Sequence, residues 1–218
     1  MTQRNHDTLQ RRNPDDETLL PLDEAHIEYV EKKVHDDPKY GPQGKELHAF
    51  IRQYPDNIKR DIVIHKILLI DFTYSTNLRY CSSRSKTFSI FKLADQMIEW
   101  NIDERIKNGD TDIVDMITKY EGANIFSFAT KFCSYHNPRD YSIFDRIVVN
   151  TLPQYLDVTQ NTIKRYKNTG YKEYHKLMTD LIRIYDLNRV SGIRRKIDHF
   201  LWYQSKLTDE QEKTENKP

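Results

Sequence analysis

The spacing of apolar residues most constrains the fold of this chain, because it repeats at three and four positions rather than at two. Steps of three and four return to one face of an α-helix, whereas a half-buried strand alternates. Only six glycines occur among the 218 residues, which also favours helices over a turn-rich sheet. The sequence therefore predicts an all-α fold, a compact multi-helix domain.

Turn-forming and capping residues divide this pattern into segments, as at Asp36-Asp37-Pro38 and Asn108-Gly109-Asp110. Residues 1–22 and 207–218 are polar or charged, which predicts flexible tails around a single domain at 23–206. The periodicity predicts helices at roughly residues 23–36, 43–54, 57–73, 86–105, 110–120, 123–136, 145–152, 159–167, 171–186 and 190–205.

Composition excludes few partners. The 34 lysines and arginines nearly balance the 33 acidic residues, so net charge does not identify an anionic ligand. Two cysteines, Cys81 and Cys133, are too few for a disulfide framework, and no paired Cys/His spacing suggests a metal site. No apolar run approaches the roughly eighteen residues of a membrane span. We expect a soluble, cytoplasmic protein that needs no metal or cofactor and does not contact a membrane.

One lysine lies within an aromatic helical pattern. On a helix over residues 123–136, Lys131 shares a face with Phe128, Phe132 and Tyr135. An amine among aromatic side chains loses hydration of its charged form, which favours the neutral, nucleophilic amine. The same spacing also fits a structural lysine whose stem packs on aromatic rings while its ammonium reaches water.

An aspartate follows the same helix. Asp145 comes after a turn at Asn137-Pro138 and precedes the apolar segment 146–149, so it is a good helix N-cap. Capping alone accounts for this residue. A capping carboxylate held at a helix start can also face a pocket and position a proton, so the two interpretations are compatible.

The segment Ser127-Phe128-Ala129-Thr130-Lys131, with Asn137-Pro138, Tyr141, Ile143 and Asp145, resembles the lysine and aspartate region of the 8-oxoguanine-type DNA glycosylases of the helix-hairpin-helix superfamily. A looser resemblance extends over about residues 45–205. It implies the helix-hairpin-helix glycosylase fold and a DNA partner that carries a damaged or modified base.

In that family the lysine attacks the sugar C1′ and displaces the base, while the aspartate stabilises developing charge and assists proton transfer. The resemblance assigns these roles to Lys131 and Asp145, with possible lyase activity at the resulting abasic site. The glycine-rich hairpin that holds a DNA phosphate in the family is represented here by Glu121-Gly122-Ala123-Asn124. The separation between lysine and aspartate is also shorter than in better-known members.

Two basic clusters are candidates for contacts with DNA phosphates. Both patterns also fit solvated helical faces. The candidate nucleic-acid-binding residues are Lys164, Arg165 and Lys167 in the first cluster and Arg194, Arg195 and Lys196 in the second.

Two other functions remain open. Arg60 and His65 are spaced as in the catalytic motif of HEPN ribonucleases, an all-helical family that cleaves RNA without metal, although His65 also fits a packing role beside apolar neighbours. The fourteen tyrosines and the many charges also fit a non-catalytic helical module that binds nucleic acid or protein.

Overall fold

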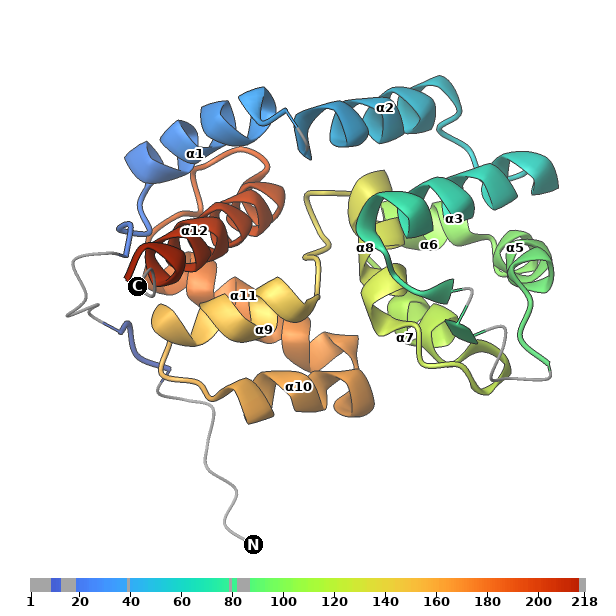
Figure 1. Cartoon of the computed structure of the whole chain (residues 1–218). Coiled ribbons are helices and arrows are strands. Elements are labelled where there is room, and N and C mark those ends of the chain that lie inside the picture. The colour runs from blue at the N-terminus through green and yellow to red at the C-terminus, as the bar shows by residue number, and fades with distance from the viewer. Residues whose placement is uncertain (1–8, 13–18, 39, 79, 82–86, 216–218) are drawn as a thin grey trace, which may run out of the picture.

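The computed structural model describes residues 9–12, 19–38, 40–78, 80, 81 and 87–215, and it is all-α as predicted (Figure 1). Within these residues, the extended backbone pairs only at one isolated bridge, between Arg11 and Leu156. The helices are α1 (Glu24–Asp36), α2 (Tyr40–Gln53), α3 (Arg60–Tyr74), α5 (Ile90–Glu99), α6 (Ile102–Lys107), α7 (Asp112–Thr118), α8 (Phe126–His136), α9 (Arg146–Thr151), α10 (Gln160–Thr169), α11 (Tyr171–Ile184) and α12 (Ile193–Glu215), with 3₁₀ turns η2 (Tyr120–Gly122) and η3 (Leu152–Gln154).

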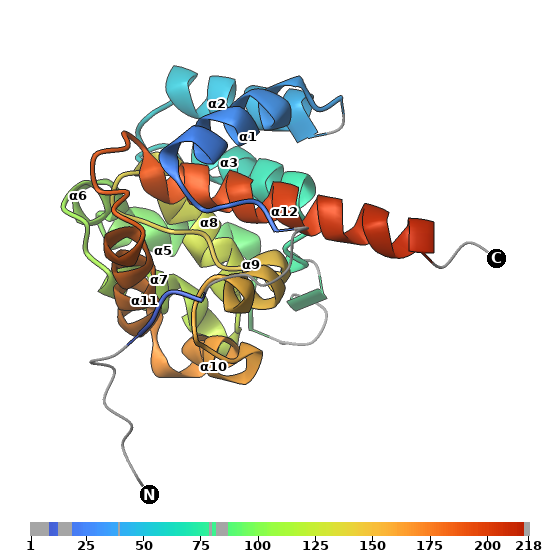
Figure 2. The ribbon, with the colours of Figure 1, turned by 90° about the vertical axis from the view of Figure 1, so that its left-hand side faces the viewer.

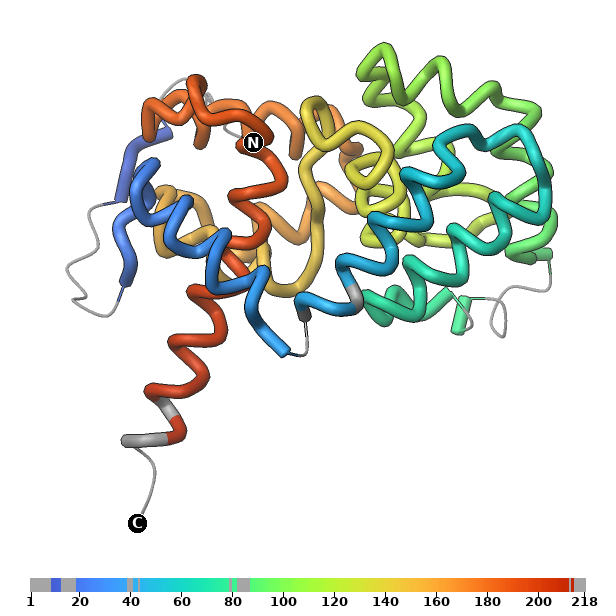
Figure 3. Tube along the Cα trace, turned by 90° about the horizontal axis from the view of Figure 1, so that it is seen from above, coloured from blue at the N-terminus to red at the C-terminus, as the bar shows by residue number. Residues whose placement is uncertain are grey.

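The helices form two groups that lie side by side (Figure 1). Helices α3 and α5 to α8 make up one group, and α1 with α9 to α12 makes up the other. Seen from above, α1 and α2 run in succession across both groups (Figure 3). The segment after α8 passes from the first group to the second, so residues on α8 and at the start of α9 meet where the groups join.

Helix α8 is the central helix of the fold. Every residue from Phe128 to Tyr135 is buried, because α8 packs against α7, α3, α6 and α2. A helix surrounded in this way needs apolar residues on nearly all of its faces. Lys131 and Thr130 are polar residues in this buried stretch, and each has polar partners inside the protein.

Two of the expected helices differ most from the observed ones. The helix expected at 86–105 is two helices, because Asn101 has a left-handed backbone (φ 50°) that ends the helical hydrogen-bond ladder. Helix α12 continues to Glu215, so most of the expected C-terminal tail is helical and extends beyond the other helices (Figure 2). No helix in the described part of the chain is both long and apolar enough to cross a membrane.

Parts of the expected N-terminal tail contact the helices. Leu22 is buried, the Leu20 amide donates a hydrogen bond to Gln204, and Arg12 donates one to the carbonyl of Pro153. Residues 1–8, 13–18 and 216–218 of the two expected tails lie outside the described residues.

A buried lysine closes the loop before α3. The Lys66 ammonium, which is fully buried, donates hydrogen bonds to the carbonyls of Pro55 and Asp56 and to the Asn57 side chain. Burial lowers the pKa of Lys66 to about 8, although the carboxylates of Asp103 and Asp56 oppose the shift. The lysine therefore orders the loop but keeps its charge less readily than a lysine in water.

This lowered pKa gives the stability of the fold a pH dependence. Between about pH 8 and the ordinary lysine pKa of 10.5, the unfolded chain binds more protons at Lys66 than the folded chain does. The contribution of Lys66 to the free energy of unfolding should therefore rise with pH. We expect the free energy of unfolding of wild type, measured in urea, to rise relative to that of Lys66→Met by about 1–2 kcal/mol from pH 7.5 to about 9.5. If the difference between the two free energies of unfolding did not change with pH, the lowered pKa of Lys66 would be contradicted.

Candidate active site

The candidate site lies where α8 meets the N-terminus of α9. The chain between these helices is tied back onto α8, because the Phe144 amide donates a hydrogen bond of 3.1 Å to Thr130 Oγ1. The Tyr174 hydroxyl also donates to the carbonyl of Ile143. These two bonds fix the backbone immediately before Asp145, so the carboxylate returns to the helix that carries Lys131.

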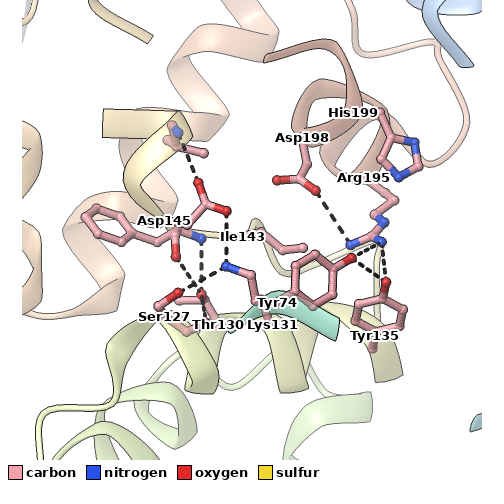
Figure 4. A network of polar contacts seen from close by, with 12 residues as sticks. Tyr74, Ser127, Thr130, Lys131, Tyr135, Ile143, Asp145, Arg195, Asp198 and His199 are labelled. Atoms are coloured by element: carbon pink, nitrogen blue, oxygen red, sulfur yellow. Dashed lines mark hydrogen bonds and ion pairs between the residues drawn. The ribbon is translucent and has the colours of Figure 1, made fainter. Parts of the chain in front are cut away.

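The lysine and the aspartate form an ion pair. Lys131 Nζ lies 3.1 Å from Asp145 Oδ2 and 3.0 Å from Ser127 Oγ, one helical turn earlier (Figure 4). Lys131 is only 1% exposed, so its ammonium does not reach bulk water in the way a surface lysine does. The structure thus places the amine against a carboxylate and a hydroxyl.

Asp145 caps α9 as expected. Its Oδ1 accepts hydrogen bonds from the amides of Ile147 (2.9 Å) and Val148 (3.1 Å), while Oδ2 faces Lys131. Burial alone would raise the pKa of Asp145, but the Lys131 ammonium and these two amides outweigh it and hold the pKa below its usual value of 3.8. The carboxyl is therefore ionised at neutral pH and fixed by contacts on both oxygens.

The pair lines a cavity of about 660 Å³. This volume is within the range of protein cavities that hold small ligands. Lys167 on α10 and Arg146 on α9 add positive charge to the wall, and Lys167 Nζ lies 5.6 Å from the centre of the Phe144 ring. The remaining lining comes from Tyr74, Ser75, Thr76, Asn77, Asn124, Ile125, Phe126, Ser127 and Ile147.

A second polar network adjoins the pair (Figure 4). Lys131 Nζ lies 5.2 Å from the centre of the Tyr74 ring, and the hydroxyls of Tyr74 and Tyr135 are bonded to each other. Arg195 donates to both hydroxyls, at 2.9 and 2.6 Å, and forms an ion pair with Asp198 at 3.7 Å. Burial raises the pKa of Asp198, although Arg195 opposes this shift. The Tyr74 ring is thereby held beside the amine.

Sequence reasoning did not single out Ser127 or Tyr74 as site residues. The spacing of four residues between Ser127 and Lys131 is a signal that was available, because it places both side chains on one face of a helix. Tyr74 is distant in sequence from Lys131, so no local pattern identifies it.

The structure places the two predicted DNA-binding clusters in different surroundings, one exposed and the other largely buried. Lys164, Arg165 and Lys167 are exposed on α10, and Lys167 also lines the cavity. Arg194 and Arg195 are each only 9% exposed, which corrects the expectation that they contact phosphates on the surface. Lys196 is half-buried.

These two arginines are buried because each meets internal hydroxyl groups. Arg194 donates to Ser142 Oγ at 3.0 Å and to Thr179 Oγ1 at 2.8 Å, while Arg195 bonds the two tyrosines. A buried guanidinium needs such partners to offset lost hydration.

The turn before α8 is a compact hairpin. Glu121 and Gly122 have left-handed backbones, with φ of 50° and 70°. The amides of Gly122, Ala123 and Ile125 donate to carbonyls of the preceding segment. Because these three amides are used internally, they are not available to a phosphate, whereas side chains such as that of Lys167 are exposed.

Arg60 and His65 do not meet within one chain. Arg60 forms an ion pair with Asp95 on α5, whereas the exposed His65 bonds the carbonyl of Asp61 and lies against Phe50 on α2. A separation of five residues places them on different sides of α3. A ribonuclease site built from this pair would require a second copy of the chain.

Comparison with known proteins gives two matches. The family model of the HI_0787_N N-terminal domain matches residues 25–140, which include Lys131 and end before Asp145. A Haemophilus influenzae protein described as uncharacterized is 28% identical over 149 residues, which cover 66% of each chain, just under two thirds of that relative's length. No solved structure matches the chain.

Proposed function

The chain belongs to the HI_0787_N N-terminal domain family, and we propose that it is a DNA glycosylase that removes a damaged or modified base through Lys131 and Asp145. One observation carries this proposal: an almost fully buried amine lies 3.1 Å from a fixed carboxylate, and both line a cavity of about 660 Å³. Buried charges are costly to maintain, so such a pair beside a cavity is a strong candidate for a reactive centre.

The contacts support a nucleophilic reaction. In the proposed reaction, Asp145 relays a proton from the Lys131 ammonium toward the departing base, and the free amine attacks the sugar C1′. The glycosidic C1′–N bond breaks with its electron pair on the departing base, which takes up the proton from Asp145. Transfer of a proton from the nitrogen to the ring oxygen opens the sugar and leaves a protonated Schiff base.

The surroundings fit an extruded nucleotide. A base must leave the duplex before an enzyme can reach its sugar, so a glycosylase needs a concave pocket and positive charge near the strand. Lys167 and Arg146 supply charge at the cavity, and Lys164 and Arg165 are exposed on the helix that carries Lys167. The hairpin between α7 and α8 is consistent with the resemblance to the helix-hairpin-helix superfamily.

Borohydride trapping tests the proposal directly. Wild-type protein is incubated with a panel of duplex oligonucleotides, each with one defined oxidised, alkylated or deaminated base or an abasic site, in the presence of sodium borohydride. Release of the free base is measured in parallel. We expect at least one duplex to lose its base and to form a covalent adduct. The absence of both base release and adducts across the panel would contradict a glycosylase function.

A further inference from the structure

A second cavity lies on the other side of the Tyr74 and Arg195 network. It has a volume of about 340 Å³ and lies among α1, α2 and the first part of α12. Arg195 is part of its wall and also bonds Tyr74, which lines the cavity of Lys131. The lining comprises Glu31, Val34, His35, Gly41, Gly44, Lys45, His48, Arg52, Arg195 and His199.

The lining carries an excess of positive charge. Lys45, Arg52 and Arg195 are cations, whereas Glu31 is the single carboxylate in the wall. Glu31 is already paired with His199, at 2.6 Å. Among the described residues, neither Lys45 nor Arg52 has a carboxylate at ion-pair distance. The cavity therefore has two cationic side chains that are available to a ligand.

A neutral histidine, His48, lies beside the cationic side chains of the cavity wall. Burial and the positive charges of Arg195, His199 and Arg52 lower the pKa of His48 to about 4. Its ring lies against Tyr135, with ring centres 4.7 Å apart. A neutral imidazole supplies one N–H donor and one acceptor, so His48 adds a directed polar group to the cavity.

We propose that this second cavity binds a small phosphorylated ligand, with Lys45 and Arg52 at the phosphate group and Arg195 at the inner wall. Cationic side chains bind phosphate oxygens through charge-assisted hydrogen bonds, which are stronger than neutral ones. The volume is suited to a molecule of the size of a nucleoside monophosphate rather than to a folded partner. This proposal does not depend on the glycosylase function.

A glycine allows the cavity to be tested without removing charge. Gly44 lies on α2 in the cavity wall, and a Cβ atom built there would meet no other atom within 4 Å. Gly44→Phe should therefore place a ring in the open space and exclude the ligand, whereas Gly44→Ala adds one methyl group and leaves most of the volume. The alanine variant should also stabilise α2 slightly, because alanine favours helix more than glycine does.

Calorimetric titration with inorganic pyrophosphate and with adenosine monophosphate tests the proposal. Wild type and Gly44→Ala should bind at least one of them, while Gly44→Phe and Arg52→Gln should weaken binding about 10-fold or more. Arg189→Gln, which changes an exposed arginine away from the cavity, should bind as wild type does. Circular dichroism checks that each variant folds. If Gly44→Phe does not fold, Arg52→Gln serves as the test.

The outcomes separate the sources of the phosphate. Tighter binding of the nucleotide supports a nucleotide ligand, and equal or tighter binding of pyrophosphate supports a free phosphate compound. Failure of wild type to bind either molecule, or equal binding by all variants, would overturn the proposal. If a single-stranded oligonucleotide alone binds, and Gly44→Phe abolishes its binding, the cavity belongs to a DNA strand and the small-ligand proposal is wrong.

Discussion

Lys131→Gln should abolish the borohydride-trapped adduct and slow base release by at least about 1,000-fold, because the variant lacks the amine that attacks C1′. Glutamine keeps much of the length of lysine and can still donate a hydrogen bond to Asp145. The effect is measured by single-turnover base release with the duplex that wild type cleaves fastest. Thermal unfolding shows how much of any loss comes from the fold.

A matched control uses a lysine outside the site. Lys92 is exposed on α5, and Lys92→Gln should leave adduct formation and base release unchanged. If Lys131→Gln retained base release at the wild-type rate while folding normally, Lys131 would not be the nucleophile. Loss of the adduct with retained base release would indicate hydrolysis by water in place of attack by the lysine.

Asp145→Asn should reduce base release by about 100-fold to 10,000-fold, the range for removing a positioned acid or base. Asparagine is also a good N-cap, so the amides of Ile147 and Val148 keep an acceptor and α9 should remain in place. Asp145→Ala removes both the charge and the cap, and it should lower the unfolding free energy by about a further 1 kcal/mol. Comparing the two variants separates the chemical role of Asp145 from its structural role.

The pH dependence of stability checks the same contact. The pKa of Asp145 is below 3.8 in the folded chain, so its ionised form stabilises the fold above that pH, and this contribution is lost as the pH falls through the folded pKa. The stability difference between wild type and Asp145→Asn should therefore shrink in acid, as followed by urea unfolding. If Asp145→Asn released the base at the wild-type rate, the Asp145 carboxylate would have no role in the mechanism.

Local patterns in the sequence identified most of the fold. The expected helix at 23–36 begins and ends within one residue of α1, because Asp23 is an N-cap and Asp37-Pro38 ends the periodic segment. The single helix expected at 86–105 is divided in the structure at Asn101. Asparagine tolerates both helical and left-handed backbones, so the residue type alone does not show that Asn101 ends a helix.

Contacts between distant segments were not predictable in the same way. The burial of Arg194 and Arg195 depends on hydroxyls supplied by Tyr74, Ser142 and Thr179, none of which is near them in sequence. A basic cluster on a helix has the same pattern whether it faces DNA, water or a set of internal hydroxyls.

The sequence by itself determined that the chain is helical, that Lys131 lies on an aromatic helical face and that Asp145 starts a helix. These properties depend on periodicity and capping, which act over a few residues. Only the tertiary structure decided that the two side chains meet at 3.1 Å beside a cavity, because the hydrogen bonds of Thr130 and Tyr174 fold the intervening chain back onto α8. A spacing of fourteen residues across a turn does not fix a distance until packing selects one path for the chain.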